Sequence, residues 1–304
     1  ERLNRLTPQT TALGEPVGVA AFGMGHTPEV PVVSAVTVDM AKYGNFIYLS
    51  EEIDLYHVNA RAARFLEELG YNAGESYNYI MRAAFAAGAT NVRYAGGAAS
   101  ISSVAAAITA NDIKYVVNQL NRQSAMKFMP MTEGSRNINT TPIRSSYYGI
   151  CHPDVEEDIR SFGHFDPVET YAGQTETLVG EFGAANGVRW VSSEISAINT
   201  TTTGMTSANG LRGDNASNHD VYDCYIYGQE AVGSVGLGLS HVQEIYETQR
   251  RLATFEMIMN PKGSAGAADP YNELTSLAWK GYLAGKVLNP SWVWRLRVAS
   301  SDLS

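Results

Sequence analysis

The spacing of apolar side chains over residues 30–49 is typical of extended structure, because this run is rich in β-branched residues and lacks a helical period. Val32, Val36, Val38 and Met40 would share one face of such a strand, while the opposite face is also partly apolar. A small hairpin cannot bury two half-apolar faces by itself. We therefore expect this segment, together with Phe46 and Tyr48 further along the chain, to lie against a neighbouring molecule.

A helical pattern follows over residues 57–87. Apolar side chains recur there every three or four positions, at Val58, Ala62, Phe65, Leu66, Leu69, Ala73, Tyr77, Ile80, Met81 and Ala84. About thirty residues in one helix would span roughly 45 Å. Gly70 and Gly74 each disfavour helix, so a bend or a break is possible near them. A helix of this length predicts a structural spine.

Shorter elements are predicted over the rest of the chain. A helix fits residues 111–123, with Thr109 or Asn111 as its N-cap, and strands fit 147–151, 221–228 and 291–299. In the last strand, apolar residues alternate with Arg295 and Arg297, which predicts one buried face and one charged face. Residues 199–219 are polar and predict an exposed loop between strands.

The opening of "HPDVEEDIR" (152–160) has the features of a helix N-terminus. Pro153 would occupy the first turn, where a missing N–H is tolerated. Asp154, Glu156 and Glu157 would then lie near the positive end of the helix dipole. This pattern explains the carboxylates without invoking catalysis.

The amino-acid composition limits the classes of function that this protein can have. Hydrophobic residues make up 44% of the chain and charged residues 17%, which is typical of a folded protein. No apolar run reaches the roughly 20 residues of a membrane helix, so we expect a soluble protein with no membrane partner. The net charge of −9 is spread along the chain without a basic cluster, which argues against sequence-specific binding of nucleic acid. Because the chain does not begin with Met, we expect it to start after a cleaved or unseen segment.

The candidate chemistry is sparse. Cys151 and Cys224 are the two cysteines, which predicts reduced thiols and a cytosolic origin. Cys151 and His152 are adjacent, so within a strand they would point to opposite faces and could not act on one another as nucleophile and base. The histidines show no metal-ligand spacing, and no phosphate-binding or hydrolase motif occurs.

We expect no catalytic residue, metal or cofactor, although a cytosolic hydrolase using Cys151 and His152 remains one alternative. Another is a phage tail or adhesin protein, favoured by the Thr-rich loop and opposed by the long helix.

Five stretches in order along the chain resemble one protein family. They are "YGNFIYLSEEIDLY" (43–56), "AAGATNVRYAGG" (86–97), "HPDVEEDIRSFGHFDPVETY" (152–171), "GEFGAANGVRWVSS" (180–193) and "DPYNELTSLAWKGYLAGKVLNPSWVWRLRVAS" (269–300). Together they resemble the major capsid proteins of tailed bacteriophages, specifically the group found in N-four-like podoviruses. In that family, the first stretch is a strand before the long helix.

The resemblance implies an α+β chain with the Hong Kong 97-type phage capsid fold. Residues 1–49 would form the extended β-hairpin arm (E-loop), and 50–110 a peripheral domain with the spine helix. Residues 111–249 would form the axial domain, and 250–304 would return to the peripheral domain, with the C-terminal strand joining the peripheral sheet.

The resemblance also implies a function. The chain would self-assemble, as hexamers and pentamers, into the icosahedral shell that encloses double-stranded DNA in the virion. Assembly would take place in the host bacterial cytoplasm. Portal and scaffolding or decoration proteins would be further partners, and the packaged DNA would meet the inner face without sequence specificity.

Overall fold

The fold is taken from a computed structural model of the chain. Its described residues are 2–3, 33–56, 61–128, 144–171, 177–199, 211–212, 220–236, 255–264 and 269–302. The chain forms two compact units, Glu1–Asp39 and Met40–Ser304. In the first unit, β1 (Arg2–Leu3) pairs antiparallel with β2 (Val33–Ser34). Val32 and most of the predicted arm lie outside the described residues, as does most of the predicted loop at 199–219.

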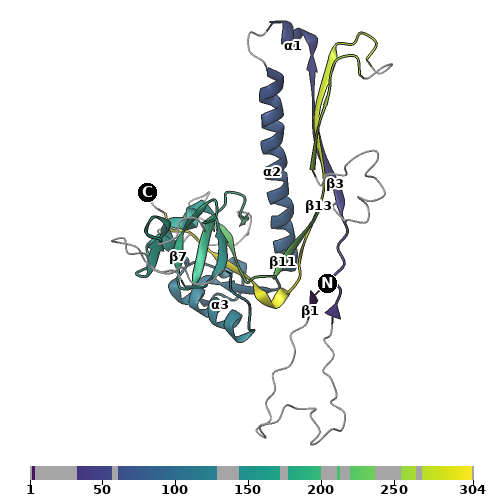
Figure 1. The fold of residues 1–304 in the computed structure, drawn as a ribbon. Coiled ribbons are helices and arrows are strands. Elements are labelled where there is room, and N and C mark those ends of the chain that lie inside the picture. The colour runs from purple at the N-terminus through teal and green to yellow at the C-terminus, as the bar shows by residue number, and fades with distance from the viewer. Residues whose placement is uncertain are drawn as a thin grey trace, which may run out of the picture. The chain divides into compact units, whose positions relative to one another are not determined.

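The second unit contains a small sheet built around one long strand, β13 (Leu274–Val287). β3 (Ala41–Ser50) pairs antiparallel with β13 along one edge, and β12 (Phe255–Asn260) and β11 (Val232–Gly236) pair with the other edge (Figure 1). Along the middle of β13, buried and half-buried residues alternate. This period of two shows that one face of the sheet is covered.

The cover is α2 (Arg61–Gly88), which follows the short helix α1 (Glu51–Tyr56) and runs beside β3 and β13 (Figure 1). Leu69 and Ala73 of α2 are buried against Leu277 and Trp279 of β13. The helix is continuous through Gly70 and Gly74, so the possible break does not occur. Residues 57–60, where the predicted helix began, lie outside the described part. None of the described helices is long and apolar enough to cross a membrane.

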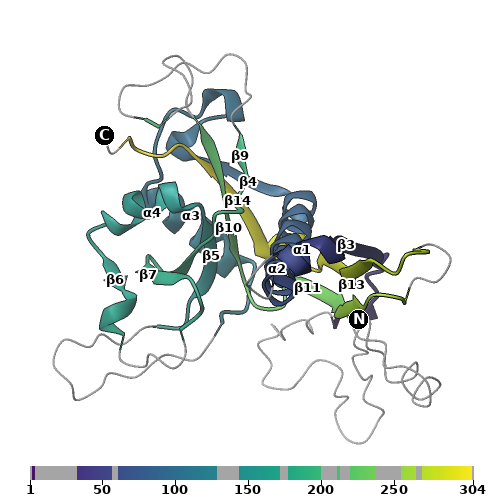
Figure 2. The ribbon, with the colours of Figure 1, turned by 90° about the horizontal axis from the view of Figure 1, so that it is seen from above.

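A larger sheet follows in the same unit, and its strand order is β4-β14-β10-β5-β8-β7-β6, with β9 also on β10. The strand bounds are Asn91–Tyr94 for β4, Tyr147–Cys151 for β5, Phe165–Pro167 for β6, Glu181–Ala185 for β7, Val188–Ser192 for β8, Ile198–Asn199 for β9, Val221–Tyr227 for β10 and Val293–Val298 for β14. Figure 2 shows β14, β10 and β5 side by side. Single 3₁₀ turns cover Ala95–Gly97, Ile101–Ser103, Val168–Thr170 and Pro290–Trp292.

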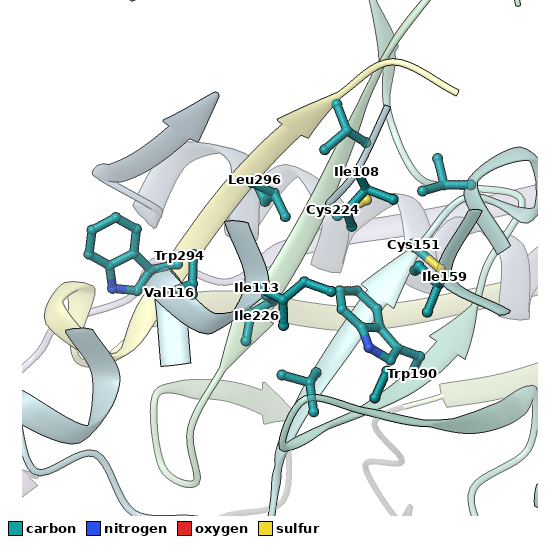
Figure 3. Close-up of a cluster of buried hydrophobic side chains, with 14 of the residues drawn as sticks. Ile108, Ile113, Val116, Cys151, Ile159, Trp190, Cys224, Ile226, Trp294 and Leu296 are labelled. Atoms are coloured by element: carbon teal, nitrogen blue, oxygen red, sulfur yellow. The ribbon is translucent and has the colours of Figure 1, made fainter. Parts of the chain in front are cut away.

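Two helices, α3 (Ala110–Arg122) and α4 (Pro153–Arg160), cover one face of the larger sheet and enclose the main core (Figure 3). Thr109 caps α3 by accepting the backbone N–H of Asp112, and His152 caps α4 by accepting that of Asp154. The predicted strand at 147–151 and the predicted helix starting at Pro153 are both confirmed. On the opposite face of the sheet, Tyr225 and Val293 pack against Phe85 of α2.

Two predicted features differ from the structure. Residues 41–49 were placed in the arm, but the first unit ends at Asp39 and β3 pairs with β13 of its own chain. The reason is that the alternating apolar residues of β3, such as Leu49, are matched by those of β13 and buried under α2. Residues 51–56 form a helix and not an extension of the strand.

The C-terminal segment contributes a strand to each sheet, because β14 lies in the larger sheet between β4 and β10, while β13 joins β3. Which of these sheets is the peripheral one stays a prediction. The charged face of β14 is not open to solvent. Arg295 and Arg297 pair with Asp223, whose side chain is fully buried on β10. This ion-pair cluster joins β14 to β10, a strand that is distant in the sequence.

Candidate assembly surface

The face of the small sheet that points away from α2 exposes large apolar side chains. Phe46 is 60% exposed and Tyr48 61%, and their rings meet edge to face with centroids 5.2 Å apart. In the strand register, Phe46 lies opposite Ala278, and Ala278 lies opposite Ile258 of β12. We call Phe46, Tyr48, Ala278 and Ile258 the outer sheet face. Large apolar groups grouped on one surface are typical of interaction sites.

Two of the charges on the same face are paired within the chain, and Lys42 of β3 is a further, exposed charge on this face. Lys280 Nζ lies 2.9 Å from Glu256 Oε2, on directly opposed positions of β13 and β12. Both side chains are about one-third exposed, so solvent screens the pair and it contributes little to stability. The face therefore offers apolar area, with few unpaired charges, to a partner.

The other face of β12 adds more apolar surface. Met257 is 38% exposed and Met259 55%, and Phe255 stacks on Trp279 at a centroid distance of 5.4 Å. Sequence reasoning missed these residues, although the alternation of apolar residues in "FEMIMN" was a usable signal.

The predicted contact residues divide between the two units. Phe46 and Tyr48 lie together on β3. Val36 and Val38 belong to the first unit and are half-buried there, and Met40, the first residue of the second unit, is 37% exposed. The proposed contact role of these residues, and of Val32, stays a prediction.

The Cys151–His152 pair does not have the geometry of a catalytic pair. The Cys151 thiol is buried in the core beside Cys224 (Figure 3), and its contact at 3.8 Å is the backbone carbonyl of Val191. Burial raises the pKa of both thiols well above the usual range, which keeps them protonated and unreactive. His152 Nδ1 accepts the N–H of Asp154 at 3.2 Å as a helix cap. These positions favour a structural role for both residues.

A buried ion pair joins β7 and β8 near one end of the larger sheet. Arg189 of β8 makes two hydrogen bonds to Glu181 of β7, with N–O distances of 2.7 and 2.8 Å, and both side chains are almost fully buried. The same carboxylate accepts the Tyr171 hydroxyl at 3.1 Å and the N–H of Leu178 at 3.1 Å. Burial and the neighbouring Glu181 carboxylate raise the pKa of Tyr171. Because both carboxylate oxygens of Glu181 accept hydrogen bonds, this cluster joins β7 and β8 to the segments at Tyr171 and Leu178 and has the character of a structural contact.

Among the described residues, no three His, Cys, Asp or Glu side chains lie close enough together to hold a metal ion.

Comparison with known proteins identifies the family. The sequence profile described as "Phage capsid protein" matches residues 34–296. No curated protein matches the chain. Several solved capsids share the fold. The capsid of Ralstonia phage GP4 superposes with a TM-score of 0.65 at 12% identity and covers 99% of this chain and 82% of its own.

Two further solved structures are similar. The head of Helicobacter pylori bacteriophage KHP40 gives a TM-score of 0.59 at 11% identity, covering 99% of this chain and 83% of its own. The capsid of cyanophage P-SCSP1u gives 0.52 at 12% identity, covering 99% and 82%. At these identities the likeness shows the fold, a mixed α/β arrangement shared with phage capsid structures. The family comes from the profile, which spans most of the chain: this protein belongs to the phage capsid protein family and is a major capsid protein of the head shell.

Proposed function

We infer that copies of this chain assemble as hexamers and pentamers into an icosahedral shell around double-stranded DNA. In this proposal the fold is of the Hong Kong 97 type. The helix α2 is the spine of a peripheral domain, the larger sheet is the axial domain, and the residues before β3 are the E-loop arm. The five stretches quoted above favour the N-four-like podovirus group. Portal and scaffolding or decoration proteins are the further partners.

The observation that carries the proposal is the exposed apolar outer sheet face on a member of the phage capsid family. A closed shell uses heterologous contacts, in which a patch on one copy meets a different patch on the next. Burying the exposed parts of Phe46 and Tyr48 would remove on the order of 200 Å² from water and contribute roughly 5 kcal/mol before ordering costs. Each copy makes several contacts, so modest single contacts hold a stable shell.

The charge of the chain suits a container for DNA. A net charge of −9 per copy gives the shell no general attraction for phosphates. Packaged DNA can then slide past the inner face during filling and release. The role is structural and not enzymatic, a reading that the buried thiols support.

Replacing both exposed aromatic residues tests the proposal. The double variant Phe46→Ser with Tyr48→Ser should fold, because neither ring belongs to a core cluster, but should give far fewer closed shells in electron micrographs. The matched control, Phe46→Leu with Tyr48→Phe, keeps the face apolar and should assemble normally. Wild-type yields of shells from the serine variant, with an unchanged circular dichroism spectrum, would contradict an assembly role for this face. Fibres from the wild-type chain would favour the tail-protein alternative instead.

A further inference from the structure

The pocket between α2 and the larger sheet contains polar groups that the fold leaves without partners. Its volume is about 330 Å³, and residues of α2, β5, β8 and β10 line it together with the turn after β8. Tyr225 is 3% exposed and Ser196 7%. Both line the pocket, and the hydroxyl oxygen of each is buried without a hydrogen-bond partner. Such orphaned hydroxyls destabilise a fold, so their presence at one pocket calls for an explanation.

The same pocket contains an arginine that lacks a counter-charge. Arg82 Nη1 donates to the backbone carbonyl of Ile195 at 2.8 Å, and the guanidinium lies 4.9 Å from the centre of the Tyr79 ring. Within the described part of the chain, Arg82 has no carboxylate at ion-pair distance, and no acidic residue lines the pocket. A guanidinium has five N–H donors, so several remain for a ligand.

Apolar side chains form much of the remaining wall, including Met81 and Phe85 of α2, Ile150 of β5 and Val191 of β8. Burial raises the pKa of Tyr225 to about 12, which keeps its hydroxyl protonated and able to donate near neutral pH. The wall therefore combines one positive charge and neutral hydroxyl donors with an apolar surface.

We propose that this pocket binds a carboxylate carried on a short apolar group, with Arg82, Tyr225 and Ser196 as its hydrogen-bond donors. One guanidinium balances the single charge of a carboxylate, whereas a phosphate carries more charge than this wall offsets. The volume lies at the low end of ligand pockets and suits a group the size of one or two residues. The carboxylate can belong to a free acid or to an Asp or Glu side chain of a protein segment in the assembled head.

Titration of the purified protein with 3-phenylpropionate tests the chemistry, with the neutral 3-phenylpropanamide as the matched probe and saturation-transfer NMR as the readout. The acid should bind at least about tenfold more tightly than the amide. Arg82→Gln should remove this preference, and Tyr225→Phe should weaken acid binding several-fold. Tyr227→Phe, two residues along the same strand and outside the pocket wall, should leave binding unchanged. Equal binding of acid and amide to the wild type would overturn the proposal.

An electron cryomicroscopy map of shells purified without added acid separates the two sources. Density on Arg82 that continues into a polypeptide assigns the carboxylate to a protein segment. In that case the pocket is blocked to the added acid, and Arg82→Gln shells should lose this density. Isolated density, or an empty pocket that takes up 3-phenylpropionate, assigns a free acid. A pocket that holds neither a polypeptide nor the added acid would contradict the proposal.

The unfolding temperature of the ligand-free protein distinguishes a ligand-binding role of Tyr225 from a structural one. Tyr225→Phe removes a hydroxyl that has no hydrogen-bond partner, so this variant should not lower the unfolding temperature.

Discussion

At the scale of single residues, the cap of α4 makes the fold sensitive to pH. His152 Nδ1 can accept the N–H of Asp154 only while that nitrogen is unprotonated. Burial lowers the pKa of His152, against the opposing effect of Asp154, with smaller contributions from Arg212, Glu194 and Asp220. A histidine with a lowered pKa in the folded state stabilises the fold above its ordinary pKa of about 6.5, and this contribution is lost as the pH falls through the folded value.

We therefore expect the free energy of unfolding to fall between pH 7.5 and pH 5.5, and part of that fall to disappear in His152→Asn. Asparagine is a good N-cap that does not titrate in this range. Urea titrations of the unassembled Phe46→Ser, Tyr48→Ser protein at both pH values provide the measurement. His164→Asn, at an exposed histidine, is the control. An unchanged pH dependence in His152→Asn would show that the cap does not carry the effect.

At the scale of elements, two glycines in α2 have opposite roles. A Cβ added at Gly88 would lie 2.4 Å from Cγ2 of Val287, a stiff β-branched side chain on β13, whereas a Cβ at Gly70 would meet nothing within 4 Å. Gly88→Ala should therefore destabilise the protein by about 1–3 kcal/mol through overpacking. Gly70→Ala should stabilise it by about 0.4–1 kcal/mol, because alanine favours helix and restricts the unfolded chain. Denaturant midpoints of the two variants check the opposite signs, and equal shifts would mean that the helix does not press on β13 at Gly88.

The same elements show how much of the fold could be predicted from the sequence. Local signals were sufficient for α2 and for the strand at 147–151, and they limited the cap of α3 to Thr109 or Asn111, since periodicity and capping depend on neighbouring residues. The neighbours of β14 were not predictable, because β4 and β10 are both distant from it in the sequence and no local pattern marks the pairing of Arg295 and Arg297 with Asp223. The pocket at Arg82 was missed for a similar reason. Residues of α2, β5, β8 and β10 form its wall, and no short sequence motif indicates that these four elements lie close together.

At the scale of the whole molecule, charge and apolar surface act in opposite directions on assembly. Each copy carries a net charge of −9, so copies repel one another, while the outer sheet face is apolar and the Lys280–Glu256 pair beside it is satisfied within the chain. Raising NaCl from 0.05 to 0.5 M shortens the screening length from roughly 14 to 4 Å and weakens the repulsion. The apolar contact is little affected. Light scattering should therefore show faster and more complete shell formation at the higher salt. A shell held mainly by ion pairs between copies would respond in the opposite way and assemble best at low salt, because the same screening would weaken the contacts themselves.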